Sequence, residues 1–163
     1  MKTIGLTGGI GTGKTEIARM LSNLGASVIS ADEMAHRTYE PDNPGWSQII
    51  REFGRDVLAV DGCIDREILG RRVFADGALL GRLNAIVHPL TADLIQEELI
   101  KLEDVGEQVV VIEAALLMQV IRDDKKWNSL VDEIWLVNSD ESLVLDRLAL
   151  HRGLELTEIR KRI

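Results

Sequence analysis

Short apolar runs alternate with amphipathic stretches along this chain. Apolar residues recur at helical spacing between the runs, which predicts helices over Lys14–Leu24, Asp32–Thr38, Pro44–Phe53, Asp65–Phe74, Pro89–Glu103 and Ser139–Leu150, with a last helical piece from about Thr157. The runs themselves are short and rich in Val and Ile, and they predict strands at Lys2–Thr7, Ser27–Ser30, Gln108–Glu113 and Glu133–Val137. This alternation predicts an α/β fold in which helices flank a parallel sheet.

The middle of the chain departs from this alternation. Residues Pro41 to Leu102 carry helical patterns but no convincing strand. We therefore expect one domain over residues 1–163 with a helical, substrate-binding insertion at about 41–104. The last residues, LTEIRKRI, stay in helical register without a capping signal, so we expect a fragment or a C-terminally shortened chain.

The composition narrows the class of protein. With 163 residues, 45% hydrophobic and 28% charged, the chain resembles an ordinary globular domain. No apolar run approaches the roughly 20 residues of a membrane span and no signal peptide precedes the first strand, so we expect a cytoplasmic protein without a membrane partner. The lone Cys63 excludes an internal disulfide, and the net charge of −8 argues against a nucleic-acid partner but not against a small anionic ligand.

A glycine-rich segment lies between the first strand and the first helix. Its residues Gly8 to Thr15, GGIGTGKT, fill every position of the G-x-x-x-x-G-K-[ST] pattern. Glycines let the backbone curl so that N–H groups point at phosphate oxygens, while Lys14 reaches the β- and γ-phosphates and the Thr15 hydroxyl binds Mg²⁺. The alternative is a glycine-rich turn without a ligand. The candidate nucleotide-binding residues are Gly9, Gly11, Thr12, Gly13, Lys14, Thr15 and Glu16.

Three classes of protein use such a loop: switch GTPases, motor-type ATPases and kinases of small metabolites. A GTPase needs a guanine-reading N-K-x-D motif, and the chain offers only Asn138-Ser139-Asp140. A motor ATPase usually has an acid pair at the end of a hydrophobic strand, whereas VVVIEA ends in the single Glu113. The GTPase is disfavoured, and the remaining choice rests on the carboxylates.

Two carboxylates follow predicted strands. Glu113 could hold the water shell of a metal ion, or it could be a helix cap or a solvated strand end. Asp32 follows the second strand, on the side where open α/β sheets bind ligands, and there it could deprotonate an acceptor hydroxyl. Aspartate is also a common helix N-cap, so the residue alone does not decide.

The surrounding motifs resemble dephospho-coenzyme A kinases from residue 2 to the end. The resemblance rests on IGLTGGIGTGKT, GASVISADEMAHRTY, FGRDVLAVDGCIDREILGRRVF, LNAIVHPL, VVVIEAALLMQ and VDEIWLV. The order and spacing of A-D-x-x-A-H, D-G-x-I-D-R and H-P make the match specific. It implies a P-loop fold with a lid region, at about 139–163 here, and transfer of phosphate from ATP to the ribose 3′-hydroxyl of dephospho-coenzyme A.

The resemblance also implies roles for single residues. Asp32 matches the catalytic base, and Lys14 and Arg147 match groups that neutralise charge on the transferring phosphoryl group. His36, Arg66 and His88 match acceptor-site positions, with His88-Pro89 opening a helix. The competing interpretations are a surface ion pair of Arg66 with Asp61 or Glu67, and a partly buried histidine before proline for His88.

Several positions depart from the family pattern. Ser30, Ala115 and Gln119 replace a usual aspartate, proline and glutamate, and the segment VIRDDKKW is longer than the usual turn. The second lid arginine would fall at His151, one place before Arg152. The competing functions are a nucleotide-binding regulatory protein without transfer activity and a kinase of another nucleotide-like hydroxyl. The sequence leaves the oligomeric state undetermined.

Overall fold

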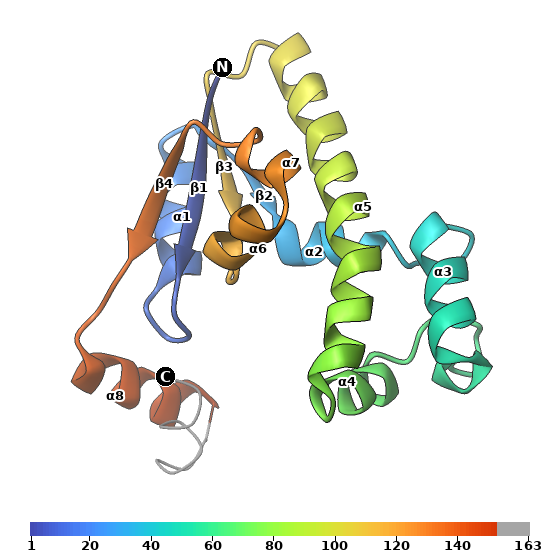
Figure 1. The fold of residues 1–163 in the computed structure, drawn as a ribbon. Coiled ribbons are helices and arrows are strands. Elements are labelled where there is room, and N and C mark those ends of the chain that lie inside the picture. The colour runs from blue at the N-terminus through green and yellow to red at the C-terminus, as the bar shows by residue number, and fades with distance from the viewer. Residues whose placement is uncertain (153–163) are drawn as a thin grey trace. The chain divides into compact units, whose positions relative to one another are not determined.

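A computed structural model describes residues 1–152, apart from the side chains of Asp123 and of residues 150–152. The chain forms two compact units. The sheet unit comprises Met1–Ser30 and the chain from Lys101, and the helical unit comprises Ala31–Ile100. The expected helix from Thr157 and the part of the predicted lid region from residue 153 onward lie outside the described residues. Figure 1 shows the elements of each unit.

The sheet unit is built on four parallel strands in the order β2-β3-β1-β4. Apolar residues on both faces keep the two central strands buried, and from Val110 to Ile112 the exposure is 0%. The predicted parallel sheet is therefore confirmed. The strands are β1 Lys2–Gly8, β2 Ser27–Ser30, β3 Val109–Glu113 and β4 Glu133–Val137.

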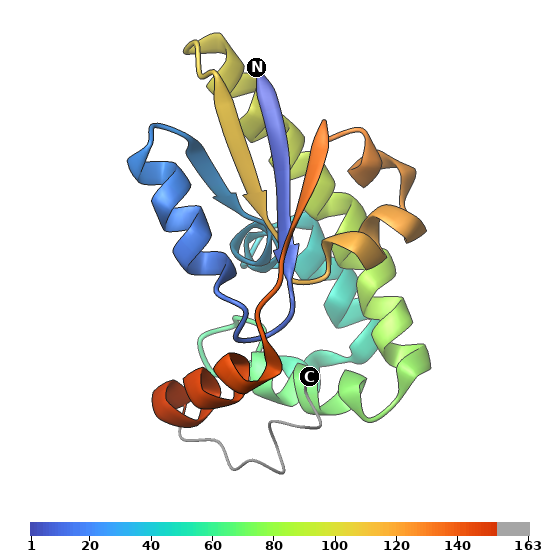
Figure 2. The ribbon, with the colours of Figure 1, turned by 90° about the vertical axis from the view of Figure 1, so that its left-hand side faces the viewer.

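Helices cover both faces of this sheet (Figures 1 and 2). Ile4 and Leu6 pack with Ala18 of α1 (Lys14–Asn23). The other face meets α6 (Leu117–Asp123), and a Cβ on Gly5 would lie only 2.5 Å from Leu117 Cδ2. Glycine at position 5 therefore lets α6 approach the central strand. The unit also contains α7 (Lys125–Asn128) and α8 (Glu141–Arg152).

The helical unit has its own apolar core. Ile49, Phe53, Val57, Leu69 and Val73 are all nearly inaccessible to solvent and pack together. They come from successive helical elements whose apolar faces converge. Packing of these faces holds the unit together, and none of the four described strands belongs to it. Its elements are α2 Ala31–Arg37, α3 Pro44–Phe53, the 3₁₀ turn η1 Arg55–Val57, α4 Arg66–Phe74 and α5 Gly77–Asp104, the last of which continues into the sheet unit.

The long helix α5 corrects one prediction from the sequence. Pro89 was expected to open a helix, but the helix begins at Gly77 and Pro89 lies inside it. Proline removes one N–H donor and usually marks a boundary, yet the buried stripe of Val87, Thr91 and Ile95 continues across it. Thr91 Oγ1 also donates to the Val87 carbonyl at 2.8 Å. Packing of this stripe outweighs the local cost of the proline.

Two further elements differ from the prediction. The short helices α6 and α7 were not predicted, because apolar residues in the segment ALLMQVIRDDKKW keep a helical spacing for less than two turns. Helix α8 begins at Glu141 rather than Ser139, which leaves Ser139 in the connection after β4. Within the described residues, no helix is both long and apolar enough to cross a bilayer.

Candidate nucleotide and acceptor sites

The glycine-rich loop joins the end of β1 to the start of α1. Gly11 and Gly13 have φ values of 75° and 99°, a region that side chains with a Cβ rarely adopt. Thr12 Oγ1 closes the loop by donating to the Gly9 carbonyl at 2.9 Å. The sequence GGIGTGKT therefore forms a tight turn directly ahead of the N-terminus of a helix, which is an arrangement that attracts anions.

A pocket of about 630 Å³ opens at this loop. Lys14 is half-buried in its wall, and Thr15 and Glu16 lie in the first turn of α1 beside it. Glu16 is exposed and paired with Arg19 at 2.6 Å, which lowers the pKa of the Glu16 carboxyl. The pocket is lined by Ile10, Gly11, Thr12, Gly13, Lys14, Thr15, Glu16, Ile17, Met20, Val137, Asn138, Ser139, Arg147 and Leu148.

The end of β3 contributes a carboxylate to this region. Thr15 Oγ1 donates a hydrogen bond to Glu113 Oε1 at 2.9 Å, although the two residues are 98 positions apart. The parallel register of β1 and β3, with Leu6 opposite Glu113, brings them together. A hydroxyl beside a carboxylate offers the oxygen ligands that Mg²⁺ accepts, since this ion usually takes one or two protein oxygens and completes its shell with water and phosphate. These two residues fit such an ion.

Arg147 lies on α8 and reaches across to the loop. Its Nη1 is 3.3 Å from the Gly11 carbonyl oxygen and 3.2 Å from that of Thr12. A Cβ added to Gly13 would lie 3.5 Å from the same nitrogen. The predicted lid arginine thus lines the same pocket as Lys14, in contact with backbone carbonyls of the loop.

In the helical unit, the A-D-x-x-A-H motif forms the first turns of α2. Ala31 is buried and Ala35 packs against the core of the unit, while Asp32 is exposed and His36 is half-buried. Each pair is spaced by four residues and shares one helix face. Helix α2 already begins at Ala31, so Asp32 lies within the first turn rather than at the N-cap position. The motif directs its two alanines inward and leaves the carboxylate accessible to a ligand.

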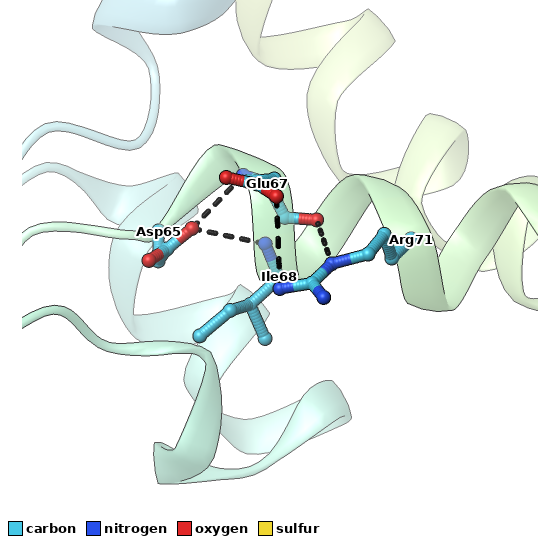
Figure 3. Close-up of polar contacts among 4 residues, drawn as sticks. All are labelled: Asp65, Glu67, Ile68 and Arg71. Carbon is cyan, nitrogen blue, oxygen red and sulfur yellow. Dashed lines mark hydrogen bonds and ion pairs between the residues drawn. The ribbon is translucent and has the colours of Figure 1, made fainter.

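The D-G-x-I-D-R motif builds a rigid turn ahead of Arg66. Gly62 has a φ of 85°, and Asp61 Oδ1 accepts from the Cys63 N–H at 2.9 Å. Asp65 then caps α4, because its Oδ1 accepts from the backbone N–H groups of Glu67 and Ile68, both at 2.9 Å (Figure 3). Arg66 follows this cap as the first residue of α4, and its position is defined by the turn before it.

Arg66 itself is exposed. Its neighbour Glu67 lies 3.9 Å from Arg71, on the next turn of α4 (Figure 3). Within residues 1–152, Arg66 forms no ion pair, so neither Asp61 nor Glu67 neutralises it by direct contact. A guanidinium without a protein carboxylate is available to an anionic ligand.

Three side chains of the helical unit influence one another electrostatically. Partial burial lowers the pKa of His36, and the positive charge of Arg66 lowers it further, against weaker opposing effects of Asp32 and Glu33. Burial raises the pKa of Tyr39, whose ring meets that of His36 edge-on at 5.9 Å. These effects favour the neutral form of the His36 imidazole, and they include an electrostatic influence of one predicted acceptor-site residue, Arg66, on another, His36.

His88 does not open a helix, as the sequence suggested, but lies in the middle of α5. It is half-buried and follows the buried Val87. Because His88 lies in the interior of α5, the packing of this helix fixes its backbone.

Two positions that depart from the family pattern share one depression of the sheet unit. Ala115 and Gln119 line a shallow pocket of about 440 Å³ together with Leu116, Met118 and Arg122. Thr7 Oγ1 donates to the Ala115 carbonyl at 3.3 Å, which ties the turn after β3 to the end of β1. These two unusual residues are thus exposed in the segment that follows β3, whereas Ser30 ends β2.

The sequence did not predict a role for two residues of these sites. Tyr39 was not singled out: it follows the end of α2 at Arg37, so no helical period indicates its ring contact with His36. Ser139 was considered as part of an incomplete guanine motif and as the start of a helix, and its hydrogen bond to the Thr12 carbonyl follows from no local pattern.

The comparisons with known proteins agree with this geometry. The family model described as dephospho-CoA kinase matches residues 2–163. A dephospho-CoA kinase of Geobacter sulfurreducens is 39% identical over 163 residues, covering 100% of this chain and 80% of the relative. One of Methylococcus capsulatus is 40% identical, covering 98% of this chain and 77% of the relative.

A solved structure has a similar fold over almost the whole chain. The crystal structure of TT1252 from Thermus thermophilus is 31% identical and matches with a TM-score of 0.78, over 99% of this chain and 78% of that one. The phosphate-binding loop, the A-D-x-x-A-H helix and the capped D-G-x-I-D-R turn all fall within the matched range. With these motifs in place and a family model spanning almost every residue, the chain belongs to the dephospho-CoA kinase family.

Proposed function

We propose that the chain transfers the γ-phosphate of ATP to the ribose 3′-hydroxyl of dephospho-coenzyme A, giving coenzyme A and ADP. The observation that carries this proposal is the family match, which spans both the nucleotide loop and the motifs of the helical unit. The pocket at the loop supports ATP binding, and the exposed Arg66 supports an anionic acceptor.

In this proposal the sheet unit holds the nucleotide. Backbone N–H groups from Gly9 to Gly13 bind phosphate oxygens, and Lys14 neutralises charge on the β- and γ-phosphates. Thr15 and Glu113 would hold Mg²⁺, and the bound ion would supply stabilisation of the negative charge on the phosphates. Their hydrogen bond of 2.9 Å supports this proposal, because it keeps the two oxygens close to each other. Glu16 is assigned to the same site through its place in the first turn of α1.

The helical unit supplies the acceptor side. We assign its helices, about 41–104, to binding of the acceptor. Asp32, two residues beyond β2, is the proposed base that takes the proton of the 3′-hydroxyl. The last residue of β2, Ser30, pairs with Glu113 in the parallel register of β2 and β3. His36, Arg66 and His88 position the acceptor, with Arg66 binding a phosphate through its planar guanidinium.

Arg147 completes the proposed site from the lid region, 139–163. It stabilises negative charge on the phosphoryl group during transfer, as a mobile cation does in other phosphoryl-transfer enzymes. Its present contacts with the Gly11 and Thr12 carbonyls keep it within the pocket that would hold the phosphates. We further propose a cytoplasmic location and no nucleic-acid partner, in line with the single cysteine and the net charge of −8.

A coupled assay of ADP release tests the proposal. ADP formation should depend on added dephospho-coenzyme A, and adenosine or AMP should substitute poorly. Equal release without the acceptor would indicate a hydrolase, and preference for another nucleoside hydroxyl would indicate a different kinase. Binding of ATP without any transfer would favour the regulatory protein.

A further inference from the structure

Ser139 lies in the connection between β4 and α8, outside the glycine-rich loop and 127 positions from the residue that it contacts. Its hydroxyl donates to the Thr12 carbonyl oxygen at 2.9 Å, and its side chain is half-buried. Hydrogen bonds within the loop are made by Thr12 itself, whose Oγ1 donates to Gly9. Ser139 therefore supplies a hydrogen bond that the loop cannot make from its own residues.

The planarity of the peptide bond gives this contact a consequence for ligand binding. In a trans peptide the carbonyl and the following N–H point in opposite directions. A Thr12 carbonyl held toward Ser139 therefore turns the Gly13 N–H away from Ser139. Gly13 has a φ of 99°, and it precedes the first residue of α1, where inward-facing N–H groups bind phosphate in loops of this kind.

Arg147 shares the same acceptor. Its Nη1 lies 3.2 Å from the Thr12 carbonyl oxygen and 3.4 Å from the Ser139 hydroxyl oxygen. A carbonyl oxygen has two lone pairs, so it can accept from both donors at once. When Arg147 turns toward a phosphoryl group, Ser139 still satisfies the carbonyl, and the loop does not have to rearrange.

The packing around Ser139 does not depend on its hydroxyl. Val144 and Leu148 of α8 are buried against Ile10 of the loop. A Cβ on Gly11 would lie 3.0 Å from Leu148 Cγ and 3.1 Å from Val144 Cγ1, so helix and loop are already in close contact. Removing the hydroxyl should therefore leave α8 and the loop together, while the Thr12 carbonyl keeps only Arg147 as a side-chain donor among the described residues.

We infer that Ser139 is a positioning residue of the nucleotide site, which orients the Thr12–Gly13 peptide for phosphate binding and keeps it oriented when Arg147 leaves. The inference rests on the proposed function for its kinetic test, but ATP binding tests it separately.

The experiment compares Ser139→Ala with the wild type by calorimetric titration with ATP and Mg²⁺. Loss of one uncharged hydrogen bond should raise the Kd for ATP about 3- to 10-fold. Ser139→Thr, which retains a hydroxyl, should restore most of the affinity. Ser142→Ala serves as the matched control, because Ser142 is an exposed serine in the first turn of the same helix. The melting temperature of all three variants should stay within a few degrees of the wild type.

Steady-state kinetics separate positioning from general damage. Ser139→Ala should raise the KM for ATP and leave the KM for dephospho-coenzyme A nearly unchanged. In an Arg147→Ala background the same substitution should weaken ATP binding by a larger factor than in the wild type, because it removes the second of the two side-chain donors that the described residues direct at the Thr12 carbonyl.

Unchanged ATP affinity in Ser139→Ala, or failure of Ser139→Thr to restore it, would overturn the inference. Equal loss of affinity for both substrates together with a lower melting temperature would reduce Ser139 to a residue that only maintains the fold. If the wild type binds ATP but releases no ADP with dephospho-coenzyme A, the proposed function fails, whereas the comparison of ATP affinities still decides the role of Ser139.

Discussion

The two units build their sites in different ways. In the sheet unit, several hydrogen bonds fix the nucleotide loop. Thr12 bonds within the loop, and Ser139 and Arg147 donate to its carbonyls. The next residue after the loop lysine, Thr15, donates to Glu113. In the helical unit, Asp32 and Arg66 are exposed side chains that extend from the first turns of two helices. One site depends on the course of the backbone, and the other depends on individual side chains.

This difference indicates where each site is sensitive to substitution. Substitution of a side chain does not remove a backbone N–H donor. We therefore expect nucleotide binding at the loop to change mainly when its cations, or the side chains that hydrogen-bond to it, are substituted. A site made of exposed side chains can lose one function by one substitution while the fold remains. Substitutions that affect catalysis, one substrate or stability alone can therefore test the comparison.

The largest effect is expected at Asp32. Asp32→Asn keeps the size of the side chain and removes its negative charge and basicity. Loss of a general base typically lowers kcat about 10²- to 10⁴-fold, and here the affinity for ATP and the melting temperature should change little. Glu33→Gln, next to it on the same exposed turn, is the matched control. A wild-type kcat for Asp32→Asn would show that Asp32 only contributes to the start of α2.

Lys14→Ala should have the next largest effect. The lysine is half-buried at the loop, where a fixed cation stabilises charge that develops in transfer, so kcat should fall about 10²- to 10³-fold. Lys125→Ala, an exposed lysine of α7, should behave as the wild type. Near-normal turnover of Lys14→Ala, measured by ADP release, contradicts the assignment of the loop.

Arg66→Ala should affect one substrate only. Loss of a charge-assisted contact with an acceptor phosphate should raise the KM for dephospho-coenzyme A about 10- to 100-fold, with the KM for ATP nearly unchanged. Arg71→Ala on the same helix removes a guanidinium that already faces Glu67 and is the control. Should the KM for ATP rise equally, Arg66 belongs to the nucleotide side.

The caps of two helices allow a paired stability test. Asp65→Ala removes the N-cap of α4, and Asp124→Ala removes that of α7, where Asp124 Oδ1 accepts from the Lys126 N–H at 2.8 Å. Each substitution should lower the free energy of unfolding by about 1 kcal/mol, measured by urea denaturation. Only Asp65→Ala should also raise the KM for dephospho-coenzyme A, because it loosens the turn that positions Arg66. Identical kinetic effects of the two would contradict the separation of the sites.

The smallest effect concerns pH. Burial and Arg66 lower the pKa of His36 below its ordinary value of 6.5, so the folded protein binds this proton less readily than the unfolded chain. The stabilisation from neutral His36 is present above pH 6.5 and is lost as the pH falls toward the lower, folded pKa. His36→Gln should therefore flatten the decrease of unfolding free energy below pH 6.5 in urea denaturation at a series of pH values. An unchanged slope would mean that His36 titrates normally.

The amino-acid sequence by itself determined the parallel sheet, the nucleotide loop and the family. These features depend on patterns that are local in the chain: Val- and Ile-rich runs, glycines at fixed spacing, and motifs such as D-G-x-I-D-R, whose turn and N-cap involve residues within a few positions of one another. Local backbone preferences and short-range hydrogen bonds are enough to specify them.

Only the tertiary structure decided the course of α5 and the long-range hydrogen bonds at the nucleotide loop. A proline predicts a helix boundary when it is considered alone, but the buried stripe of Val87, Thr91 and Ile95 carries the helix through Pro89. The contacts of Thr15 with Glu113 and of Ser139 with Thr12 join residues about a hundred positions apart. No local pattern encodes such pairs, because they form when strand register and helix packing bring distant segments together.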